Sequence, residues 1–230
     1  NGDYHSTSHF DLVDDAVSWL DALNEFDFCH QEQVFLLGHS EGCIIAPQVN
    51  LKRPLVAGMV LLCPFIETLE ITLRKQAKTL QQELNDRKGV SGVLGRLFFK
   101  LVGQPVDSQN KLIAKIANST TDYFYMRFRK MEAKWFRELL TIDPPKIFEK
   151  VSAPILAIAG EKDIQCQSQD ANEISRVVDV PIDVHIISDL THILRRDEAI
   201  PSFANYSKQL EKPIDIEVLT RISSWLTKQK

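Results

Sequence analysis

Three residues whose side chains could together perform nucleophilic catalysis follow one another along the chain: Ser40, then Asp163, then His192. A serine hydroxyl is a weak nucleophile until a base takes its proton, and a histidine can do so at neutral pH. A carboxylate holds the imidazole in the correct tautomer and stabilises its protonated form. These residue types therefore indicate acyl transfer through a serine nucleophile.

Ser40 is the centre of the pentapeptide Gly-His-Ser-Glu-Gly, which spans residues 38–42. Apolar residues 34–37 precede it and small residues 43–46 follow it. Gly-x-Ser-x-Gly between a strand and a helix is the nucleophile-elbow pattern, in which a strained turn exposes the hydroxyl. We expect both glycines to be needed because a side chain at either would meet neighbouring backbone. Alternatively, Ser40 is a turn serine that caps the following helix.

The elements that must position these residues alternate between strands and helices. Apolar runs at 33–38 and 56–63 predict two parallel strands buried on both faces, and 154–160 and 184–187 predict two more. Ser40, Asp163 and His192 each follow a different one of these strands, at the carboxyl edge where sites form in such sheets. Helical spacing predicts helices at the following apolar sets: Leu12, Ala16, Leu20 and Leu23, flanked by Val13, Val17 and Trp19; Ala171, Ile174 and Val178; Val218, Ile222, Trp225 and Leu226. The predicted class is α/β, with a mostly parallel sheet and helices on both faces.

The pattern changes between residues 65 and 151, where about four helices are predicted between two strands. Apolar stripes mark them at 69–84, at 93–101 (ended by Gln104-Pro105), at 112–116 and in an aromatic-rich run from Tyr123 to Leu139. Asp143-Pro144-Pro145 ends the series. We therefore divide the chain into a first core segment (1–64) with the elbow, a helical cap insertion (65–151) and a second core segment (152–230). Phe128, Trp135 and Phe136 could line a substrate pocket, although aromatic residues at helical spacing also form cores.

Composition bounds the function. The 230 residues are 44% hydrophobic and 25% charged with a net charge of −4, which argues against a nucleic-acid partner. No run approaches the roughly 18 apolar residues of a membrane span. The four cysteines lack metal-ligand spacing, and the three that lie in or beside apolar segments are expected to be buried reduced thiols, which suits a cytoplasmic protein without a metal centre. The oligomeric state is left open.

The histidines and acids other than the three candidates have plainer interpretations. His39 is expected to be packed or hydrogen-bonded within the elbow, and His185 to be structural. His5, His9 and His30 are expected to be solvated. Asp189 is a rival acid, but it stands only three residues before His192 and is expected to support that loop. Asp163 and His192 could themselves be a turn aspartate and a surface histidine.

The elbow, the stretch 154–163 and Asp189-Leu190-Thr191-His192 together resemble the α/β-hydrolase superfamily. Within it, Gly-His-Ser-Glu-Gly followed by Ile45-Ala46-Pro47 is similar to the serine-aminopeptidase-like and acyl-ester hydrolase branch. The resemblance implies hydrolysis of a small or medium acyl ester or thioester through an acyl-enzyme, without a cofactor, beneath a helical cap. It also implies that the amide of Glu41 is an oxyanion donor. The alternative is an aminopeptidase, in which the Glu41 carboxylate could bind a substrate amine or simply face solvent.

The elbow begins at residue 38, whereas the family places it roughly a hundred residues in. The upstream strands, and the loop that carries the second oxyanion donor, have no counterpart here. Loss of one oxyanion donor typically costs about a hundred- to a thousandfold in rate. Loss of the strands would also expose an apolar edge beside residues 34–37. We therefore expect a fragment or truncated product, and a non-catalytic remnant is a third interpretation.

Overall fold

The computed structural model describes residues 6–23, 25–27, 29–89, 92–94, 97, 103–126 and 129–229. The chain divides into two compact units. One combines Asp11–Glu67 with Asp143–Lys230, and the other comprises Thr68–Ile142 with the residues ahead of Asp11.

The first unit is built on a four-stranded parallel sheet. Its strands are β1 (Phe35–His39), β2 (Gly58–Leu62), β5 (Ile155–Gly160) and β6 (Ile182–Ile187), in the order β1-β2-β5-β6. The two central strands are buried along their whole length, which is why they are uninterrupted apolar sequences. Because all four strands run in the same direction, the loops that follow them leave from one edge of the sheet.

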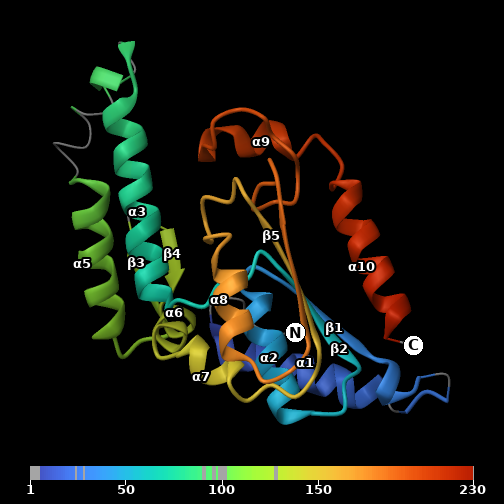
Figure 1. Ribbon diagram of the computed structural model, residues 1–230. Coiled ribbons are helices and arrows are strands. Elements are labelled where there is room, and N and C mark those ends of the chain that lie inside the picture. The colour runs from blue at the N-terminus through green and yellow to red at the C-terminus, as the bar shows by residue number, and fades with distance from the viewer. Residues whose placement is uncertain are drawn as a thin grey trace. The chain divides into compact units, whose positions relative to one another are not determined.

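Helices cover both faces of this sheet, as predicted (Figure 1). The helices α2 (Gly42–Lys52) and α8 (Asp170–Val177) contact strands from one side, and α10 (Ile216–Lys228) contacts β5 from the other. The remaining helices of the unit are α1 (His9–Leu23), whose first two residues are grouped with the other unit, η2 (Gln31–Gln33), α7 (Pro144–Phe148), η3 (Phe203–Asn205) and α9 (Tyr206–Gln209).

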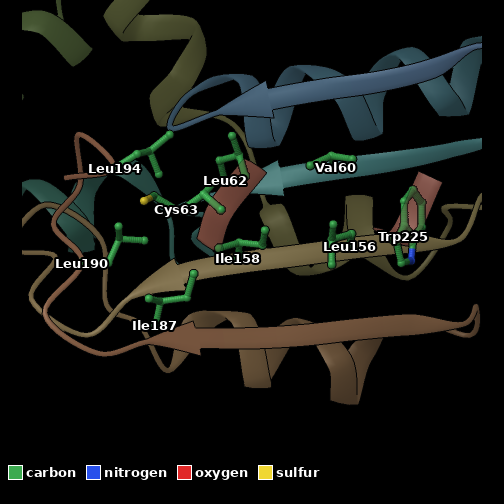
Figure 2. Close-up of a cluster of buried hydrophobic side chains, with 10 residues drawn as sticks. Val60, Leu62, Cys63, Leu156, Ile158, Ile187, Leu190, Leu194 and Trp225 are labelled. Carbon is green, nitrogen blue, oxygen red and sulfur yellow. The ribbon is translucent and has the colours of Figure 1, made fainter. Parts of the chain in front are cut away.

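A cluster of buried side chains joins α10 to the sheet and to the loops at its carboxyl edge (Figure 2). Alternate residues of β2 and β5 face Trp225, which is 4% exposed and packs edge-on against Phe35 with ring centroids 5.8 Å apart. At the other end of the cluster, Leu190 and Leu194 belong to the loop that carries His192. The core of the unit therefore extends beneath that loop and fixes its path.

The second unit contains α3 (Leu69–Asp86), α5 (Pro105–Ala117), β3 (Tyr123–Met126), β4 (Arg129–Glu132) and α6 (Ala133–Leu140). The helices α3 and α5 lie side by side (Figure 1), and β3 pairs with β4 in an antiparallel hairpin. Buried Ile116, Phe124 and Ala133 form its core. The prediction of one helix from Tyr123 to Leu139 was therefore wrong in its first half. Tyr123 and Tyr125 are exposed while Phe124 is buried, and this alternation is that of a strand.

Two prolines predicted to follow the end of a helix are each also the first residue of the next helix. Pro105 is the first residue of α5, and Pro144 is the first residue of α7, whose Asp143 side chain accepts a hydrogen bond from the Lys146 amide. Proline suits this position because the first amides of a helix have no internal partner. Much of the helix predicted at 93–101 lies outside the described residues.

Three predictions of burial were also wrong. The strand β1 is not buried on both faces: Leu37 is 58% exposed, and among the described residues β1 pairs only with β2 and so forms an edge. Trp19 is 74% exposed, since Val13, Val17 and Leu20 form the buried stripe of α1 and Trp19 lies away from it. His9 is fully buried rather than solvated. Among the described helices, none is both long and apolar enough to cross a bilayer.

Candidate active site

Ser40 sits in a sharp turn between β1 and α2. Its φ of 56° lies in the left-handed region, which is strained for a residue other than glycine. The Ser40 amide donates to the Leu62 carbonyl at 3.0 Å, so the turn is anchored on the end of β2. Its own carbonyl accepts from the Cys43 amide at 2.9 Å as α2 begins. The strand–turn–helix context predicted for the pentapeptide is present.

The two glycines of the elbow are not equivalent. A Cβ on Gly38 would lie 2.1 Å from the Gly42 carbonyl oxygen, so no side chain fits there without moving the backbone. A Cβ on Gly42 would meet nothing within 4 Å. The expectation that both positions exclude a side chain was therefore wrong for Gly42. The two positions differ because a Cβ on Gly38 would point at the backbone of Gly42, whereas a Cβ on Gly42 would point into open space.

Asp163 lies three residues beyond β5, and its side chain is only 1% exposed. One carboxylate oxygen, Oδ1, accepts hydrogen bonds from the amides of Gln165 (2.8 Å) and Cys166 (2.9 Å). The other, Oδ2, lies 2.8 Å from Nδ1 of His192. The loop thus orients the carboxylate by its own backbone and leaves one oxygen for the histidine.

His192 follows β6 and is 4% exposed. Its Nε2 lies 3.0 Å from Oγ of Ser40, so the structure brings Ser40, Asp163 and His192 into one continuous chain of hydrogen bonds. An ionised carboxylate only accepts, so Nδ1 carries the hydrogen and donates it to Asp163. In this tautomer the bare Nε2 accepts from the serine hydroxyl. That is the arrangement in which a histidine can take the proton of a serine nucleophile.

His39, beside Ser40, contacts the histidine loop as well. Its Nε2 donates to the backbone carbonyl of His192 at 2.8 Å, and the two imidazole centroids are 5.0 Å apart. His39 keeps solvent contact, but partial desolvation of the ring lowers its pKa below the usual histidine range, and the hydrogen bond to His192 opposes this. His39 was expected to be packed or hydrogen-bonded within the elbow; it is hydrogen-bonded, but to the loop of His192.

Asp189, the rival acid, pairs with Lys162 at 2.7 Å and has a φ of 58°. It is Asp163 that contacts the imidazole. His185, in β6, accepts a hydrogen bond from Arg221 of α10 at 2.9 Å. Desolvation, and next the positive charge of Arg221, lower the pKa of His185. Both residues therefore have contacts that support the structure around the site.

Two groups of possible metal ligands gather around His192: one with His39 and Cys63, the other with Asp163 and Cys166. Neither is visible in the sequence, because in each group His192 is brought from a distant part of the chain. Burial raises the pKa of both thiols, which keeps them protonated and makes them poor ligands. Both nitrogens of His192 are already engaged by Ser40 and Asp163. The donors of these two groups therefore suit hydrogen bonding better than metal binding.

The remaining predicted site residues are the oxyanion candidate Glu41 and the three aromatic candidates for the substrate pocket. Glu41 is the residue ahead of α2, so its amide lies at the positive end of that helix. In the other unit, Trp135 and Phe136 of α6 are half-buried with ring centroids 4.5 Å apart, and Phe136 packs against the buried cluster there. That packing favours the core interpretation of Phe136. Phe128 lies outside the described residues.

Sequence reasoning missed Lys162, whose side chain reaches the loop of His192. A single lysine before an aspartate carries no recognisable pattern. The only available signal was its position one residue ahead of the candidate acid. The strained backbone of Cys63, with φ 54°, was also missed, because no sequence pattern marks it.

Comparison with known proteins identifies a family, a curated relative and similar folds. Residues 1–199 match the family model described as serine aminopeptidase, S33. Esterase EstD from Thermotoga maritima is 25% identical over 224 residues, which cover 95% of this chain and 48% of EstD. The chain thus spans about half the length of this curated relative.

Several solved structures share the fold. A structure from the metagenome-derived lipolytic enzymes LipS and LipT has a TM-score of 0.57 at 12% identity, covering 97% of this chain and 75% of that one. Mouse alpha/beta hydrolase domain-containing protein 10 gives 0.56 at 14%, covering 100% and 74%. Est1E from Butyrivibrio proteoclasticus with bound ferulic acid gives 0.54 at 15%, covering 92% and 73%. With a family match over most of its length and this fold, the chain belongs to the serine aminopeptidase S33 family of α/β hydrolases.

Proposed function

We propose that this protein is a serine hydrolase that cleaves carboxylic esters through an acyl-enzyme intermediate. One observation carries the proposal: Ser40 Oγ, His192 and Asp163 are linked by hydrogen bonds of 3.0 and 2.8 Å at the carboxyl edge of a parallel sheet. The similarity to EstD supports an ester as the substrate class.

In the first half of the reaction, Ser40 Oγ attacks the ester carbonyl carbon while Nε2 of His192 takes the hydroxyl proton. The imidazolium that forms is stabilised by the buried carboxylate of Asp163, which stays ionised. The carbonyl oxygen becomes an oxyanion, and the Glu41 amide at the helix N-terminus is the donor that we assign to it. Collapse of the tetrahedral intermediate breaks the bond to the leaving alkoxide, which takes the proton from His192.

In the second half, His192 takes a proton from water and the resulting nucleophile attacks the acyl-serine. The intermediate collapses, Ser40 Oγ regains its proton and the carboxylic acid leaves. The same steps act on a thioester, with a thiolate as the leaving group. We propose a small or medium acyl group, with Phe128 and Trp135 as candidates to line its pocket and Phe136 as the weaker candidate because it packs in the insertion core.

The family description favours a second candidate, an aminopeptidase acting on short peptides. The machinery is the same, with His192 protonating a leaving amine. In this case the Glu41 carboxylate, one residue from the nucleophile, would bind the substrate amino group. A panel of acyl esters and aminoacyl amides separates the two. If Glu41→Gln turns over peptides as fast as the parent chain, Glu41 does not bind the amine.

The decisive experiment is labelling with a fluorophosphonate probe, which reacts with activated serines. We expect labelling of the parent chain, none of Ser40→Ala, and competition by a p-nitrophenyl ester. Equal labelling of the two proteins would contradict a serine hydrolase and leave the non-catalytic interpretation.

A further inference from the structure

Two loops must be in register for the Asp163–His192 hydrogen bond to form. The acid loop, residues 161–166, follows β5, and the histidine loop, residues 189–199, follows the neighbouring strand β6. Two backbone hydrogen bonds connect the acid loop to this region: the Glu161 amide donates to Ile187 at the end of β6 (3.0 Å), and the Lys162 amide donates to Leu190 in the histidine loop (2.9 Å). Both contacts lie ahead of His192 in the chain. Neither bond therefore connects the acid loop to the part of the histidine loop that follows His192.

The side chain of Lys162 contacts the histidine loop on both sides of His192. Its ammonium lies 2.7 Å from Oδ1 of Asp189, where the loop begins. It also donates to the carbonyls of Asp197 (2.9 Å) and Ala199 (3.1 Å), where the loop ends. An ammonium has three N–H donors, and here three acceptors are available for them. One side chain therefore holds the beginning and the end of the histidine loop to the acid loop.

Burial of the ammonium and strain in the loop distinguish this contact from a fully exposed ion pair. The Lys162 side chain is 18% exposed and that of Asp189 is 38% exposed, so the contact depends on the three hydrogen bonds of the ammonium more than on the charge of Asp189. Asp189 and Leu194 both have left-handed φ angles (58° and 62°), so the loop is held in a conformation that it would not favour alone. Because its three donors are engaged, Lys162 has none left for a substrate.

We propose that Lys162 is a positioning residue, which holds the histidine loop in register with the acid loop and so keeps His192 aligned between Asp163 and Ser40. This inference rests on the proposed hydrolase function. A misplacement of about 1 Å can cost about a hundredfold in rate, and the fixed geometry is what Lys162 supplies.

The test is Lys162→Met, assayed with p-nitrophenyl butyrate. We expect kcat to fall about 10- to 100-fold while KM changes less than about twofold, because the reacting groups lose alignment and the substrate loses no contact. The matched control is Lys212→Met, since Lys212 also donates to a carbonyl of the histidine loop (Arg196, 3.2 Å) but does not join it to the acid loop. The control should keep the parent kcat.

A second readout separates positioning from general stability. The proton shared by His192 Nδ1 and Asp163 gives a far-downfield proton NMR resonance, which we expect to shift or broaden in Lys162→Met and not in Lys212→Met. Should Lys162→Met fail to fold, Asp189→Asn removes one charged acceptor at nearly constant shape, and kcat should fall about 3- to 10-fold.

The two proposals fail in different ways. Parent kcat and an unmoved resonance in the folded variant would overturn the role of Lys162 and leave the hydrolase intact. Absence of fluorophosphonate labelling in the parent chain would overturn the hydrolase. The resonance would then still report whether Lys162 aligns the pair.

Discussion

At the scale of single residues, the site is defined by contacts on the backbone of His192 as much as on its ring. His39 donates to its carbonyl, and the Cys63 thiol approaches the same oxygen at 3.5 Å. Two residues from two strand ends thus hold the main chain of His192 while Asp163 and Ser40 engage its nitrogens. The imidazole has little freedom to leave the line between its partners.

The lowered pKa of His39 predicts a pH dependence of stability. The unfolded chain has an ordinary histidine pKa of about 6.5 at this position, whereas the folded chain resists protonation. As pH falls below about 6.5, the unfolded state binds the proton first, so the free energy of unfolding decreases on acidification. In His39→Gln, the amide can still donate to the carbonyl, but the decrease in unfolding free energy that His39 causes is absent. Urea unfolding at about pH 7.5 and about pH 5.5 measures the unfolding free energy of both proteins.

His185 also has a lowered pKa, but it is present in both proteins and its contribution cancels in the comparison. We therefore expect the parent chain to lose more unfolding free energy than His39→Gln over this interval. Parallel losses in the two proteins would show that His39 is not the group responsible.

The three candidate catalytic residues could be found from the sequence because each is a reactive type placed directly after an apolar strand. Lys162 could not, because its role depends on carbonyls some 35 residues away that become neighbours only when β5 pairs with β6. The metal-like groupings around His192 were invisible for the same reason. Sequence reasoning identifies reactive groups, whereas the residues that hold them are identified by tertiary contact.

At the scale of elements, the strands were predictable wherever burial was complete. The runs at 56–63 and 154–160 contain β2 and β5, the two central strands. The hairpin β3–β4 was missed because its alternation extends over only three residues, Tyr123 to Tyr125. The helical spacing of Trp135, Phe136 and Leu139 just beyond belongs to α6 and dominated the pattern.

The elbow gives a prediction with an internal control. Gly38→Ala places a Cβ 2.1 Å from the Gly42 carbonyl, so the turn must open and we expect a loss of about 1–3 kcal/mol or more in unfolding free energy. Because Ser40 lies in that turn, fluorophosphonate labelling should slow as well. Gly42→Ala meets open space at the start of a helix and should stay within about 0.5 kcal/mol of the parent. Urea denaturation of both variants measures this difference. Similar stabilities of the two variants would contradict the conclusion that only Gly38 excludes a side chain.

At the scale of the whole molecule, the fold class and the family were predictable, because the elbow, the acid and the histidine occur in the order and context of α/β hydrolases. An exposed apolar edge beside residues 34–37 was also expected, and among the described residues β1 does pair on one side only. The burial of β1 on both faces was inferred from its composition alone, and composition does not specify which strand lies at an edge.

An exposed edge strand offers unpaired backbone groups to a second chain. Among the described residues β1 pairs on one side only, and Leu37 in it is 58% exposed. We therefore expect this chain, expressed by itself, to self-associate as its concentration rises, and Leu37→Lys to reduce that association because a charged side chain on an edge opposes strand pairing. Sedimentation velocity over a concentration series measures the weight-average mass. Leu210→Lys is the matched control, since Leu210 is 59% exposed but lies outside the sheet. An equal effect of the two substitutions would attribute association to general surface hydrophobicity, and no effect of Leu37→Lys would exclude the β1 edge as its cause.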